Sequence, residues 1–183
     1  IDLLLILPLL VLSGSAAVTL VLLTLRRGHG TVFAATLAGL VLTIASIPRA
    51  ASAPDPQVTP LVRMDGLALL VVLALTGAAA VVACLARDYL EKRPEHPEEF
   101  YGLLQLATLG SAVLASSTHF ASLFLGLETL SVSLYGLIAY SRSASLCAEA
   151  GIKYLVLAGA SSGFLLFGMA LLYAETGALD FAG

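Results

Sequence analysis

Charge is scarce in this chain. Only 11% of the 183 residues are Asp, Glu, Lys or Arg, and 59% are hydrophobic. An average soluble domain carries about 25% charged residues. A soluble fold of this length has too little interior to bury so many apolar side chains. The composition therefore excludes an ordinary soluble domain and predicts an integral membrane protein.

Tryptophan is absent, and cysteine occurs only twice, as Cys84 and Cys147. No CxxC pair, Cys/His cluster, glycine-rich phosphate loop or nucleophile elbow is present. The formal net charge is only -3, and no run of basic residues could follow a phosphate backbone. The sequence thus predicts no nucleic-acid binding, no metal or cofactor site in this chain, and no catalytic residues of its own.

Long apolar runs are what the chain has instead. A transmembrane helix needs about 20 mostly apolar residues, and lipid favours helices because it offers backbone groups no hydrogen-bond partners. We expect one all-α transmembrane domain of about six helices. The first run lacks the basic start of a signal peptide and is taken as a retained span. The expected spans cover residues 3–25, 31–47, 67–86, 100–117, 120–140 and 151–174.

Basic residues in the connections predict the orientation of the bundle. Six spans place both ends of the segment on one side of the membrane. The alternate loops on that side contain only Arg49 and Arg63, so we expect both ends to be periplasmic in a bacterial plasma membrane. The opposite, cytoplasmic face is expected to hold Arg26, Arg27, Arg87, Lys92, Arg93 and Arg142, with Lys153 nearby.

Glu128 is the one carboxylate of the expected spans with several apolar turns on both sides. An ionised group at mid-bilayer costs at least about 2.5 to 3.5 kcal/mol, so such residues usually face a partner, a cavity or a proton path. At 100° per residue, Glu128 shares a helix face with Ser131 and Tyr135. A carboxyl beside hydroxyls suits a proton relay. The alternative is a permanently neutral or hydrogen-bonded carboxyl that only packs helices.

Four further residues are candidates for function or packing. Lys153 offers an amine to a relay, or forms an ion pair with Glu149 one helical turn earlier. His119, in the short connection after the fourth span, can pass protons at the periplasmic face or is an ordinary interfacial turn residue. Gly159 and Gly163 form a GxxxG pair, which favours close helix packing.

The settings of Glu128 and Lys153 resemble a known family. LGLETLSVSLY at 125–135 and GIKYLVLAGASSGFLLFGMALLY at 151–173 resemble the N subunits of bacterial NADH-quinone oxidoreductase, which is respiratory complex I. The likeness covers about residues 60 to 183 with specific strings. The sister subunits M and L usually carry a tryptophan before the glutamate, whereas this chain has Leu127.

The resemblance implies the first part of a 14-helix antiporter-like fold built from two inverted repeats. It matches Glu128 to a fifth-helix glutamate that biases a lysine on the seventh helix, and Lys153 to a lysine that opens the sixth. It implies a subunit that takes part in proton translocation coupled to quinone reduction. FMN, iron–sulfur clusters and quinone would belong to other subunits, and the partners would be other membrane subunits of the complex and lipids.

Six helices do not include the seventh-helix lysine or the second repeat. We therefore expect a fragment, a split subunit, or the ordered part of something longer. Two other functions fit the same repeat: a subunit of a Mrp-type cation/proton antiporter or of a membrane-bound hydrogenase, and a structural scaffold without its own proton path.

Overall fold

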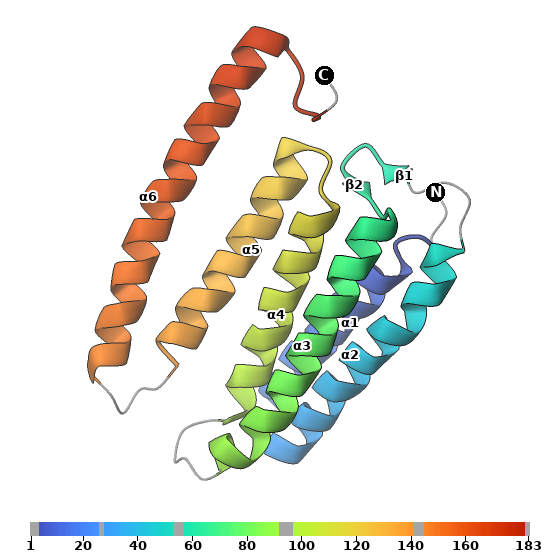
Figure 1. The fold of residues 1–183 in the computed structure, drawn as a ribbon. Helices are drawn as coiled ribbons and strands as arrows, with labels where there is room; N and C mark the ends of the chain where they lie inside the picture. Colours follow the sequence, from blue (N-terminus) through green and yellow to red (C-terminus); the bar gives the residue numbers. More distant parts are fainter. Residues whose placement is uncertain (1–3, 26–27, 53–56, 92–96, 141–144, 182–183) are drawn as a thin grey trace.

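The chain forms a bundle of helices with one small β-hairpin (Figure 1). The structure is a computed structural model that describes residues 4–25, 28–52, 57–91, 97–140 and 145–181. Successive helices run in alternating directions, so that the N-terminal end, the hairpin and the C-terminal end lie at the same end of the bundle. In the described residues the elements are α1 (Leu7–Leu25), α2 (His29–Ala51), β1 (Gln57–Thr59), β2 (Val62–Arg63), α3 (Gly66–Glu91), α4 (Pro97–Ser116), α5 (Phe120–Ile138) and α6 (Ser145–Thr176).

Five of these helices are long and apolar enough to cross a membrane, namely α1, α2, α3, α5 and α6, and their mean hydropathy is 1.5 to 2.7. The chain is a multi-pass membrane protein, and the predicted all-α membrane fold is confirmed. Although α4 was also expected to be a span, it falls outside this group. It packs against α1, α3 and α5 and buries polar side chains such as Gln105 and Thr108. A helix that faces other helices rather than lipid needs less hydropathy.

Several helices are longer than the expected spans. α3 continues to Glu91, and α6 begins at Ser145 and ends at Thr176. An apolar window marks only the stretch suited to hydrocarbon, whereas the backbone hydrogen bonds continue through interfacial polar residues. α1 begins at Leu7, directly before Pro8, and proline favours the first turn because it needs no partner for an N–H. The basic positions 26, 27, 92, 93 and 142 lie outside the described residues, so the orientation stays a prediction.

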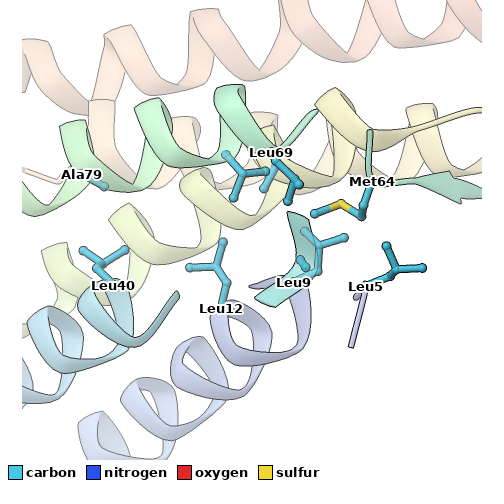
Figure 2. Packing of buried hydrophobic residues seen from close by; sticks show 10 residues of the cluster. Leu5, Leu9, Leu12, Leu40, Met64, Leu69 and Ala79 are labelled. Carbon is cyan, nitrogen blue, oxygen red and sulfur yellow. The ribbon is translucent and has the colours of Figure 1, made fainter. Parts of the chain in front are cut away.

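The first four helices share an apolar core. Leu9 and Leu12 of α1 face Leu40 of α2 and Leu69 of α3 (Figure 2), and Leu12 and Leu40 are fully buried. A second cluster lies around the fully buried Tyr101 of α4. α5 packs against α4, and α6 packs mainly against α5. The bundle is therefore dense around α4 and open around α6.

The hairpin β1–β2 holds the turn between α4 and α5. The backbone N–H of Thr118 donates to Leu61 O at 3.1 Å, and the Ser122 hydroxyl donates to the same oxygen at 2.6 Å. The segment that follows α6 in the chain returns to this turn. There the N–H of Phe120 donates to Leu179 O at 2.9 Å, and the N–H of Phe181 donates to Thr118 O at 3.0 Å. The start of α5 is thus fixed from two sides.

Candidate functional site

A close approach of two backbones orients α5. A Cβ atom added to Gly110 of α4 would lie 2.5 Å from Leu130 N and 2.8 Å from Gly126 O. A Cβ on Gly126 would lie 2.8 Å from Leu114 N. The faces of α4 and α5 that carry these glycines are therefore in direct backbone contact. Two residues, or about 200° of rotation, separate Gly126 from Glu128, so Glu128 lies on the face of α5 away from α4.

Glu128 is half-buried, and its Oε1 atom is fully shielded without a hydrogen-bond partner among the described residues. The helix that carries it has a mean hydropathy of 1.5, so its flanking turns offer little polar compensation. Leaving a buried polar atom unpaired costs about 1–3 kcal/mol, and more for a charged group. A hydrogen-bond donor or a positive charge from outside the described residues would offset this cost.

Ser131 and Tyr135 both turn toward α6. Ser131 is 9% exposed and lines a groove of about 630 Å³ between α5 and α6. The ring of Tyr135 meets that of Tyr154 edge to face, with the centroids 5.4 Å apart. Ser131 and Tyr135 therefore both lie beside α6, and their part in supporting Glu128 stays a prediction.

Ser162 is a site residue that the sequence analysis did not single out. It lines the same groove, is 6% exposed, and has an Oγ without a partner among the described residues. α5 and α6 are antiparallel (Figure 1). From the Tyr135–Tyr154 contact, Glu128 lies seven residues along α5 and Ser162 eight along α6, which is about 11 and 12 Å of axial rise. Glu128 and Ser162 are therefore at the same level of the bundle.

The fold does not place Lys153 near Glu128. Its Nζ donates to Glu149 Oε1 one turn earlier on α6, and the two side chains are 69% and 56% exposed. Nine residues, or about 14 Å of helix axis, separate Lys153 from the level of Ser162. This is the ion pair that the sequence allowed as the alternative to a relay.

His119 caps α5 at the end where the hairpin lies. Its Nδ1 accepts the backbone N–H of Ala121 at 3.0 Å. It is nine residues from Glu128, about 14 Å along the axis. The contact gives His119 a structural role at the turn, and its predicted part in proton uptake or release stays a prediction.

Gly159 and Gly163 have no close neighbour in the described part of the chain, since a Cβ added to either would meet no atom within 4 Å. Close packing there stays a prediction for a neighbour outside these residues. Among the described residues, no group of three or more His, Cys, Asp and Glu side chains is placed to hold a metal ion.

Comparison with known proteins connects this arrangement to a family. Residues 117–183 match the family described as NADH:quinone oxidoreductase/Mrp antiporter, TM. The chain is 44% identical over 175 residues to NADH-quinone oxidoreductase subunit N of Methylococcus capsulatus, a match that covers 96% of this chain and 36% of that protein. The chain is a homologue of part of subunit N. It spans only about a third of the length of this relative.

Solved structures share the fold of this chain. A chain of respiratory complex I from Thermus thermophilus, determined with bound aureothin, is 29% identical with a TM-score of 0.82, over 96% of this chain and 38% of that one. A chain of an archaeal membrane-bound sulfane sulfur reductase is 24% identical with a TM-score of 0.70, over 97% and 38%, and shows the fold alone. Glu128, Ser131, Tyr135, Lys153 and Ser162 all lie within the residues that match the family.

Proposed function

We propose that this chain is part of a membrane-arm subunit of a proton-translocating NADH:quinone oxidoreductase, and that Glu128 takes up and releases a proton during turnover. One observation carries the proposal: a carboxyl oxygen is shielded inside a membrane-spanning helix without a partner in the described residues. The homology to subunit N supports the setting. FMN, iron–sulfur clusters and quinone would be held by other subunits.

The chemistry follows from the position of Glu128. In a low-dielectric surrounding, a nearby positive charge favours the carboxylate, and removal of that charge favours the protonated acid. Because Glu128 lies away from α4, such a charge has to approach from the side of α5 and α6 that the described chain leaves open. A charge that moves in this region during turnover would alternately load and unload Glu128.

Lys153 enters this proposal as a second relay group. It would have to leave Glu149 to exchange protons with groups at the level of Glu128. The pair is an exposed (i, i+4) contact worth only about 0.3–0.5 kcal/mol, so its opening demands little free energy.

The test replaces Glu128 by Gln in the assembled complex, since this change keeps the shape and removes the titratable group. We expect quinone reduction to continue with fewer protons pumped per quinone. Glu175→Gln is the matched control, because Glu175 is an exposed carboxylate near the end of α6. Pumping by Glu128→Gln equal to that of the wild type would contradict the relay and favour the scaffold interpretation.

A second candidate, a Mrp-type cation/proton antiporter subunit, is favoured by the description of the matched family, which includes both kinds of protein. The chains that co-purify with this one from its native membrane separate the two. Flavin and iron–sulfur subunits in the particle would support the oxidoreductase, and a particle without redox groups would support the antiporter.

A further inference from the structure

Gln105 is a fully buried amide in α4, and its hydrogen bonds are incomplete. Its Nε2 donates to Ser15 Oγ of α1 at 3.3 Å and to Thr36 O of α2 at 3.5 Å. Ser15 gives its own proton to Leu12 O at 2.9 Å, so toward Gln105 it is an acceptor. Two acceptors thus fix the orientation of the amide. The oxygen Oε1 is buried and has no partner among the described residues.

Two buried threonines, Thr19 of α1 and Thr36 of α2, differ from the other buried threonines of the described bundle. In each of the other three, the hydroxyl donates to the carbonyl four residues earlier, at 2.7 to 2.8 Å; these are Thr43, Thr76 and Thr108. Thr19 and Thr36 are also fully buried, but their Oγ1 atoms have no partner in the described residues. Any threonine in a helix can form this bond with its own helix. The side chains of Thr19 and Thr36 do not form it, which leaves both hydroxyls available to another partner.

Gly39 allows the three helices to meet at this level. A Cβ atom on Gly39 would lie 2.3 Å from Ser15 Cβ and 3.2 Å from Gln105 Nε2. Thr19 follows Ser15 by one turn on the same face of α1. Ser15, Thr19, Thr36 and Gln105 therefore form one buried group from α1, α2 and α4, which we name the Gln105 cluster.

We propose that the Gln105 cluster binds internal water between α1, α2 and α4. A buried water typically makes about three hydrogen bonds to polar groups that otherwise lack partners. A water that accepts from the Thr19 and Thr36 hydroxyls and donates to Gln105 Oε1 satisfies all three atoms. Lipid cannot supply these partners.

The ligand is water rather than a cation. The cluster contains no carboxylate, and the two N–H bonds of the Gln105 amide point to Ser15 and Thr36, which puts positive hydrogens among the oxygens. The cluster is also separate from Glu128, which lies on the face of α5 away from α4. Because none of its four side chains titrates near neutral pH, the water stabilises the polar interior of the bundle without storing charge.

The test is a cryo-EM map of the assembled complex at a resolution that shows ordered water. We expect a density peak within hydrogen-bonding distance of Gln105 Oε1 and of at least one of the Thr19 and Thr36 hydroxyls. A double variant, Thr19→Val with Thr36→Val, keeps the side-chain shape and should lose the peak. Thr43→Val is the matched control and should keep it, because the Thr43 hydroxyl bonds within its own helix.

Two results would overturn the proposal. In one, the map shows the Thr19 and Thr36 hydroxyls bonded to the carbonyls of Ser15 and Val32 and no peak at Gln105 Oε1. In the other, a peak makes the short contacts of a metal ion and disappears when sodium is left out of the buffer. If the double variant does not assemble, the wild-type and Thr43→Val maps decide, since each shows whether the peak is present and what it contacts.

Discussion

The contact between Gly110 and α5 makes a quantitative prediction for Gly110→Ala. The added methyl would lie 2.5 Å from Leu130 N, whereas ordinary contact begins at 3.4 Å. The two helices must therefore separate by about 0.9 Å at this point. Since the obstacle is backbone rather than the end of a flexible side chain, the strain has no local relief. Overpacking of this kind costs about 1–3 kcal/mol.

The assay is thermal unfolding of the purified complex, and the release of this chain from the complex is the quantity measured against temperature. For a domain of 150–250 residues, about 1 kcal/mol lowers the midpoint by 2–4 °C, so we expect a fall of about 2–12 °C. Gly77→Ala is the control, because a Cβ on Gly77 of α3 meets no atom within 4 Å. Proton pumping should fall as well, since α5 carries Glu128. Equal midpoints for the two variants would refute the close backbone contact.

Three further predictions concern His119, Lys153 and the orientation. His119→Ala removes the cap of α5 and should lower stability by about 0.5–2 kcal/mol in thermal unfolding, and His119→Asn should restore most of it; an unchanged midpoint in His119→Ala would contradict the cap. Lys153→Met should lower proton pumping while Glu149→Gln does not. Equal pumping in the two variants would contradict a relay role for Lys153 and leave the ion pair with Glu149 as its only role. If the ends of the segment are periplasmic, Cys147 lies at the cytoplasmic face. In a Cys84→Ser background, an impermeant thiol reagent should then label Cys147 in inverted vesicles and not from the periplasmic side. The reverse labelling pattern would show that the predicted orientation is wrong.

The sequence alone located the helices and singled out Glu128 as a candidate, whose role stays a prediction. Apolar windows of about 20 residues locate helices because lipid enforces them, whatever their neighbours are. Glu128 stood out for the same reason, since a carboxylate between apolar turns is costly in any membrane bundle. The short connection expected at Thr118 and His119 likewise lies between α4 and α5 in the structure.

Contacts between helices could not be predicted in the same way. The GxxxG spacing of Gly159 and Gly163 is a local pattern and does not say which face of a helix meets another. In the described chain the closest approach of two backbones occurs instead at Gly110 and Gly126. The β1–β2 hairpin was also missed, because its strands are too short for an alternating pattern. Nothing in the sequence around Ser162 singles it out, because only its position in the groove opposite α5 distinguishes it from its neighbours.

The buried polar atoms without partners in the described chain fall into two groups with different chemistry. Those of Thr19, Thr36 and Gln105 are neutral and can be satisfied by a neutral ligand such as water. Glu128 can carry a charge, and Ser162 at the same level offers only a hydroxyl. A hydroxyl stabilises a carboxylate much less than a cation does. Under the function proposed above, a positive group that controls the proton on Glu128 would therefore approach from the side of α5 and α6 that the described chain leaves open.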